Sequence, residues 1–149
     1  MIGNLIRLSL AVPMLLYALA SARSELDPKV VSYLKQDQIK WRDPANKGPN
    51  NSAFLHGDPS RTGFYVQLQR WNRGHFSGPH HHPHDRFMYI FSGTWWNGTG
   101  PTVDRESSVP MRMGTAVSHF GKGVHWDGAK DDDAIFVIIG MGPGTPIQV

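Results

Sequence analysis

The clearest pattern in the sequence is an alternation of apolar and polar residues over short segments bounded by glycine. Residues 63–71 read GFYVQLQRW, with large apolar side chains at every second position. Because successive side chains of a strand point to opposite faces, this run predicts a strand with one buried face. Shorter runs predict further strands at residues 52–56, 94–97, 115–120, 123–126 and 134–140. Many short strands with glycine turns favour an all-β sandwich or barrel.

The run RFMYIFS at residues 86–92 is apolar at almost every position. Its alternation sends one set of side chains to one face and a second set to the other: Arg86, Met88 and Ile90, against Phe87, Tyr89 and Phe91. A strand with two apolar faces is covered on both sides. We therefore expect one face in the barrel interior. The other is expected to lie against a second layer, an N-terminal arm or the partner subunit of a homodimer.

The first 22 residues have the layout of a secretory signal peptide. Arg7 precedes an apolar run at residues 8–19, and the small residues Ala20 and Ala22 follow it. The run is shorter than the roughly 20 residues of a membrane-spanning helix. We expect cleavage after Ala22, a mature protein without a membrane anchor, and a periplasmic or secreted location.

The remaining chain is expected to form one domain preceded by an arm. Residues 23–60 would form the arm, and residues 61–149 the barrel core. Within the arm, the pair Asp27 and Pro28 is a good helix start, which predicts a short helix over residues 28–35. Alternation over residues 37–41 predicts a first edge strand.

Composition excludes several functions. The formal net charge is only +3 and no dense basic run occurs, so nucleic acid is not an expected partner. Cysteine is absent, so neither disulfides nor thiolate ligands contribute to the fold or to a site.

Histidine carries the strongest chemical signal, because five of the eight histidines lie in residues 74–93. His80 and His82 are two residues apart, and in an extended chain their imidazoles point to the same face. Such a pair supplies two adjacent ligands for a divalent metal. A third ligand must come from elsewhere, and His119 and His125 are the downstream candidates.

At these residues the sequence resembles the cupins, a superfamily of small β-barrels marked by two motifs, G-x5-H-x-H-x3-4-E-x6-G and G-x5-P-x-G-x2-H-x3-N. In the first motif Gly74, His80, His82 and Gly93 match, and Arg86 stands at the glutamate position. In the second motif Gly114 and His125 match. The positions of its proline, second glycine and asparagine are taken by Phe120, Lys122 and Ala129. The resemblance implies a cupin-type jelly-roll β-barrel and a metal held by His80, His82 and His125.

Arg86 departs from the family pattern, since a guanidinium has no free lone pair for a metal. It would either clamp a carboxylate or phosphate of a substrate or pair with an acid on the barrel wall. Asp85 is a candidate for that acid, or for a fourth ligand if the strand shifts by one residue. His84 would be a replacement ligand, a neighbour of the ligands or a solvent-exposed residue.

The main functional hypothesis from these residues is a metal-dependent enzyme. Its substrate would be a small organic molecule, with an anionic one favoured. The cofactor would be one divalent transition metal: Fe, Mn, Zn, Ni or Cu. Iron would suit oxidative cleavage, whereas zinc or manganese would suit isomerisation or hydrolysis. The alternatives are a non-catalytic periplasmic protein that binds a small ligand or a metal, and a metal-free barrel whose histidines bind an anion.

Overall fold

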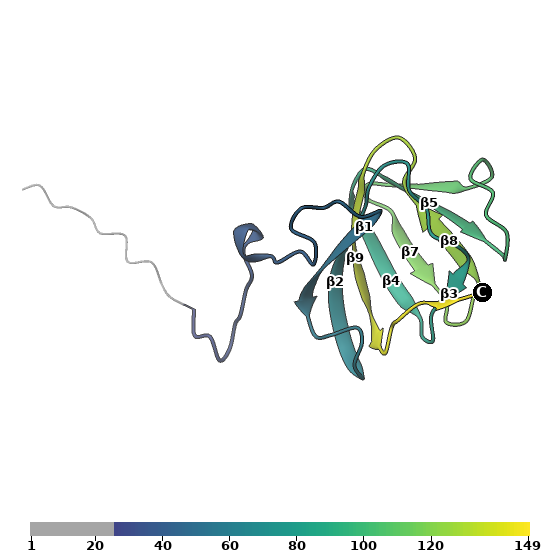
Figure 1. The fold of residues 1–149 in the computed structure, drawn as a ribbon. Helices are drawn as coiled ribbons and strands as arrows, with labels where there is room; N and C mark the ends of the chain where they lie inside the picture. The colour runs from purple at the N-terminus through teal and green to yellow at the C-terminus, as the bar shows by residue number, and fades with distance from the viewer. Residues whose placement is uncertain (1–25) are drawn as a thin grey trace, which may run out of the picture. The chain divides into compact units, whose positions relative to one another are not determined.

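The computed structural model describes residues 26–149, and residues 34–149 of it form one compact unit of two antiparallel sheets (Figure 1). The predicted signal peptide lies outside the described residues. The elements of the described chain are the 3-10 helix η1 (Gln36–Gln38) and the strands β1 (Asn50–His56), β2 (Gly63–Trp71), β3 (His80–His81), β4 (Arg86–Ser92), β5 (Thr94–Thr99), β6 (Val109–Arg112), β7 (Ala116–His119), β8 (His125–Gly128), β9 (Ala134–Gly142) and β10 (Ile147–Gln148).

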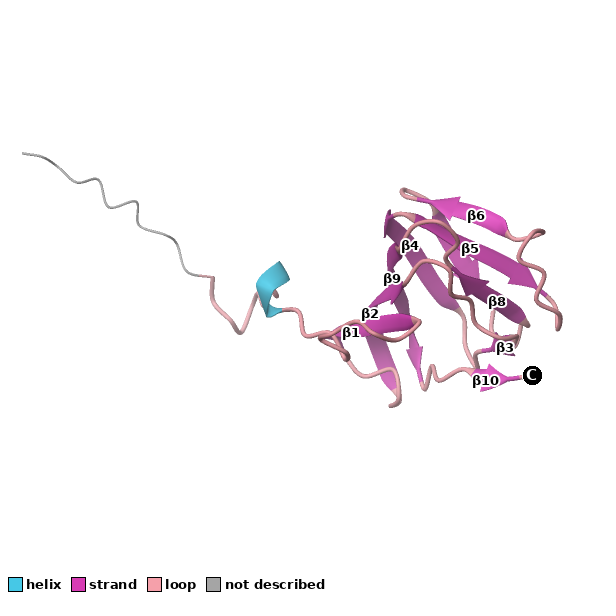
Figure 2. Ribbon diagram, turned by 45° about the horizontal axis from the view of Figure 1, so that its top comes forward, coloured by secondary structure: helices cyan, strands magenta, loops and turns pink. Residues whose placement is uncertain are grey.

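Each sheet is assembled from both halves of the chain. The first has the strand order β1-β2-β9-β4-β7 and the second the order β10-β3-β8-β5-β6. Figure 2 shows β10, near the C-terminus, next to β3. Strands distant in sequence are therefore neighbours, as in a jelly roll. The predicted all-β jelly-roll fold is confirmed.

The interior between the sheets combines an apolar core with a polar wall. Trp95 and Phe136 stack with ring centroids 4.2 Å apart, and Ile90 beside them is fully buried. On β2, Tyr65 is buried at the interior face, and Gln67 and Gln69 line a cavity there. The interior side of β2 is thus its more polar side, which is unusual for a barrel and provides donors and acceptors for a ligand.

The predicted alternation of β4 is confirmed, with Arg86, Met88 and Ile90 buried. The opposite side chains, Phe87 and Tyr89, are 54% and 45% exposed. Within residues 34–149, no second layer covers this face. The outer face of the first sheet is therefore an exposed apolar surface.

The helix predicted over residues 28–35 is wrong in extent. One turn forms there, in which Val30 and Val31 donate backbone hydrogen bonds to the carbonyl of Asp27. Both valines are exposed, and β-branched side chains without a packing partner favour helix weakly. The short helix is instead η1, one turn further along the chain.

The edge strand predicted over residues 37–41 is also wrong. Only Trp41 forms an isolated bridge, to Ala53, while η1 occupies the start of this segment. The edge strand of the first sheet is β1, which pairs with β2 along its whole length. Strands β6 and β10 were not predicted from the sequence. Among residues 26–149, no helix is long and apolar enough to span a bilayer.

Candidate metal centre

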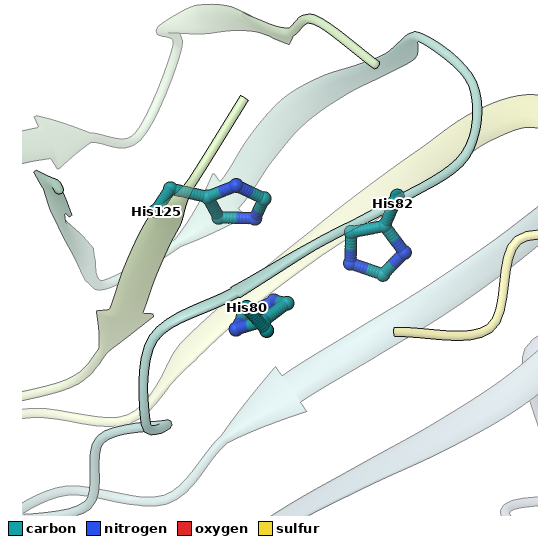
Figure 3. Close-up of side chains that lie close together, drawn as sticks. All are labelled: His80, His82 and His125. Atoms are coloured by element: carbon teal, nitrogen blue, oxygen red, sulfur yellow. The ribbon is translucent and has the colours of Figure 1, made fainter. Parts of the chain in front are cut away.

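Three histidines meet at one end of the second sheet. His80 lies on β3, His82 follows two residues later, and His125 begins β8 directly opposite His80 in the register of the two strands. Figure 3 shows the three rings around a common space. One nitrogen of each lies within 4.8 Å of those of the other two, and all three residues are buried. The structure therefore brings together the three residues that the sequence indicated as ligands.

The backbone fixes the orientation of each ring. The Nδ1 atom of each ring lies within hydrogen-bond distance of a main-chain carbonyl and, as an N–H group, donates to that carbonyl oxygen. The carbonyls belong to Gly78 for His80 (3.0 Å), Gly144 for His82 (2.7 Å) and Gly123 for His125 (2.9 Å). A histidine that donates from Nδ1 keeps the lone pair of Nε2 for a ligand, the usual arrangement around protein-bound metals.

Burial also favours the neutral state that a metal requires in two of the rings. Burial lowers the pKa of His82 to about 3, and the nearby charge of Arg86 lowers it further. Burial likewise lowers the pKa of His125. Three converging imidazoles fit a divalent transition metal in donor type.

Arg86 lies at the start of β4 and is only 8% exposed. Its Nη2 is 3.5 Å from Nε2 of His125 and 3.4 Å from Nδ1 of His119. The guanidinium thus lies beside the histidines at the position where the cupin motif has its carboxylate. It brings a positive charge, not a ligand, to the centre.

His119 is buried next to the three histidines but has a different hydrogen-bond pattern. Its Nε2 donates to Oδ1 of Asn97 at 2.9 Å, which leaves Nδ1 as the acceptor facing Arg86. Burial lowers its pKa to about 2, so the ring stays neutral. His119 therefore orients Arg86 and is not grouped with the three candidate ligands.

Asp127 is a member of the site that sequence reasoning missed. Its Oδ1 accepts a hydrogen bond from Nε1 of Trp95 at 3.0 Å, and its Oδ2 is 3.8 Å from Nε2 of His80. The residue is 4% exposed. The spacing in the sequence could have indicated it: Asp127 follows His125 by two positions, so the two side chains share a face of β8. It supplies the negative charge nearest to the histidines.

His84 and Asp85 are exposed and line a different hollow, of about 570 Å³, together with Phe64 and Phe87 on the outer face. Asp85 accepts a hydrogen bond from the backbone N–H of Gly121 at 2.7 Å. Asp85 thus holds the loop at Gly121, and neither residue is grouped with the three histidines.

Two of the three histidines, His80 and His82, line a cavity of about 620 Å³, and Arg86 lines it as well. Polar side chains from β2 and apolar ones from β4 and β9 form its walls. They include Gln67, Gln69, Tyr65, Met88 and Ile138. This volume and mixed lining suit a small organic ligand.

Comparison with solved structures identifies the fold. KdgF from Halomonas sp. has a TM-score of 0.58 at 17% identity, over 74% of this chain and 94% of its own. The polyketide cyclase RemF from Streptomyces resistomycificus has a TM-score of 0.64 at 14% identity, over 80% and 85%. A cupin-2 domain protein from Rhodospirillum rubrum has a TM-score of 0.58 at 14% identity, over 79% and 80%.

The sequence matches no family model and no curated protein. The structural similarities nevertheless agree with the motif in residues 74–93, and the chain has the cupin fold.

Proposed function

We propose that this protein is a metal-dependent enzyme acting on a small, polar organic molecule. One observation carries the proposal: His80, His82 and His125 are buried and oriented by backbone carbonyls so that one ring nitrogen of each converges on a common space. The Nδ1 atoms of all three rings are taken up by carbonyls, so the converging nitrogens are the ones available to an ion. That the polyketide cyclase RemF has the same fold supports an enzymatic role.

A bound metal would supply Lewis acidity, by which an oxygen atom of the substrate is polarised. The three imidazoles would hold the ion, and Asp127 would offset part of its charge. Gln67 and Gln69 would orient the polar groups of the substrate by hydrogen bonds. The donor set suits iron, manganese, zinc, nickel or copper.

The test is the metal content of protein purified without an affinity tag, measured by elemental mass spectrometry. We expect about one equivalent of a transition metal in the wild type and its loss in His80→Ala and His125→Ala. His56→Ala, which removes an exposed histidine, should keep the metal. A wild type that stays metal-free even after reconstitution would contradict the proposal.

A second candidate function is capture of a small ligand without turnover. A buried arginine within 3.5 Å of a candidate ligand favours it, because a fixed positive charge stabilises a bound anion without contributing a proton-transfer group. Metal-dependent turnover of candidate substrates that is lost in His82→Ala would support the enzyme. Ligand binding without turnover of any candidate would support the binding protein.

We also propose that residues 1–22 are removed during export. The support is the sequence pattern of Arg7, the apolar run and the small residues before position 23. The intact mass of protein from a periplasmic fraction should correspond to a chain beginning at Arg23. A mass that includes residues 1–22 would contradict this.

Finally, we propose that the outer face of the first sheet joins two copies of the chain. Phe64, Phe87, Phe91 and Met141 are each more than half exposed on β2, β4 and β9. The register places Phe64 opposite Met141 and Phe87 opposite Ile139, so these side chains form a continuous patch. Contiguous apolar surfaces of this kind mark interaction sites.

A further inference from the structure

The guanidinium of Arg86 is buried without an acidic partner. Among the described residues, no carboxylate oxygen lies within 4.0 Å of it. Its contacts are neutral: Nη2 lies near His119 and His125, and the hydroxyl of Tyr65 is beside it. Its Nε is buried without any hydrogen-bond partner. A buried charge is normally paired, so this arrangement leaves a strong donor set unused.

The nearest acid cannot supply the missing contacts. Asp127 attracts Arg86 through space, but its oxygens lie toward Trp95 and His80. Its single negative charge offsets one positive charge. With a dication on the histidines, the charges of the ion, Arg86 and Asp127 would leave a positive excess in a buried site, which a bound anion would relieve.

Arg86 lines the same cavity as His80 and His82. The only other basic residue among those lining the cavity is Arg42, which is exposed. The parallel N–H groups of Arg86 match the two oxygens of a carboxylate in shape. A phosphate dianion would be expected to need further buried cations or backbone donors.

We propose that Arg86 is the subsite for a carboxylate group, and that the protein therefore acts on organic acids. The inference rests on the proposed function, because it names the substrate class of that same cavity. His119 acts as a positioning residue: it accepts from Arg86 through Nδ1 and is fixed by Asn97 through Nε2. The N–H groups of the guanidinium that face the cavity are the ones left to the carboxylate.

The test compares binding of propionate with that of neutral propionamide, which has nearly the same shape, by ligand-observed NMR. In the wild type, propionate should bind at least about tenfold more tightly, as charge-assisted bonds to a buried guanidinium imply. Arg86→Gln should lose this preference, and Arg86→Lys should retain part of it. Arg112→Gln, which removes the same charge from an exposed position on β6, should behave as the wild type.

Equal binding of the two probes in the wild type, or no binding of propionate, would overturn the subsite. So would a folded Arg86→Gln variant that still prefers propionate. Tighter binding of inorganic phosphate than of propionate would overturn the carboxylate assignment.

Metal content, measured on each variant, separates this result from the proposed function. If the wild-type protein contains metal but does not prefer propionate, the proposed metal enzyme stands and the carboxylate subsite is refuted. If the wild-type protein contains no metal but prefers propionate in a way that depends on Arg86, the carboxylate subsite stands and the metal enzyme is refuted. Loss of the preference in Arg86→Gln with unchanged metal content supports both.

Discussion

Lys122 has a backbone conformation that its side chain disfavours. Its φ is 64°, in the left-handed region, and it stands where the cupin motif has glycine. Its N–H bonds to the carbonyl of His82 at 2.7 Å, and the turn that contains it leads into His125. The chain has therefore kept the turn that places the third histidine while replacing the residue type that favours it.

We expect Lys122→Gly to stabilise the protein by roughly 0.5–1 kcal/mol. Removing the left-handed strain contributes about 1–2 kcal/mol, and the greater freedom of glycine in the unfolded chain offsets part of it. The free energy of unfolding in urea measures the change. Lys47→Gly is the matched control, because Lys47 is exposed and has no positive φ, and it should destabilise slightly. Equal effects of the two substitutions would contradict the explanation.

At the scale of elements, β4 has two different roles. Its inner face brings Arg86 to the histidines, while its outer face carries Phe87, Tyr89 and Phe91. Period-two alternation alone assigned these side chains to opposite faces. Alternation could not show what covers the outer face, because a partner subunit is not encoded in the local pattern.

If two copies meet on this face, Phe87→Ser should weaken the dimer strongly. Burial of one phenylalanine contributes about 1.5–3 kcal/mol, and a twofold interface uses the residue twice, so the dissociation constant should rise at least about a hundredfold. Size-exclusion chromatography with light scattering measures this. Met113→Ser removes an exposed apolar side chain outside the strands and should leave the dimer intact. A monomeric wild type at high concentration would refute the interface.

At the scale of the whole molecule, the buried histidines make stability depend on pH. Burial lowers the pKa of His82 to about 3 and that of His119 to about 2, and it also lowers the pKa of His125. Each has an ordinary pKa of 6.5 in the unfolded chain. Below pH 6.5 the unfolded state therefore binds protons that the folded state excludes. The stability present above pH 6.5 is progressively lost as the pH falls.

For metal-stripped protein, we expect His82 and His119 each to contribute a loss of about 1.4 kcal/mol at a pH one unit below 6.5, and His125 to add a loss in the same direction. Urea unfolding at several pH values between about 8 and 5.5 measures the loss. Carboxylates change their charge below this pH range. The pKa of Asp133, for example, is lowered from its ordinary value of 3.8, mainly by a backbone hydrogen bond from Arg73.

His119→Gln should reduce the loss of stability at a pH one unit below 6.5 by about 1.4 kcal/mol, whereas His56→Gln, at an exposed position, should leave it unchanged. Constant stability across this pH range in the wild type would show that the histidines are not held neutral by the fold.

The sequence by itself determined the features that depend on local geometry. Strands β2 and β4 follow from two-residue alternation, and the shared face of His80 and His82 follows from the same period. The spacing of Gly74, His80, His82 and Gly93 was sufficient to indicate the cupin fold. The partial second motif, with Gly114 and His125, indicated the third candidate ligand. The two wrong predictions, the helix over residues 28–35 and the strand over 37–41, lie in a segment with few packing partners. There, intrinsic helix or strand propensity is not reinforced by tertiary contacts.

Only the tertiary structure decided what depends on contacts between distant segments. Gly144, on the connection from β9 to β10, orients His82. Asp127 approaches His80 because β3 pairs with β8. His119 contacts Arg86 because β4 pairs with β7. Strand order and register set these contacts, and neither follows from the alternation within one strand. The sequence thus placed the candidate metal ligands, whereas the fold decided the charge and hydrogen bonding around them.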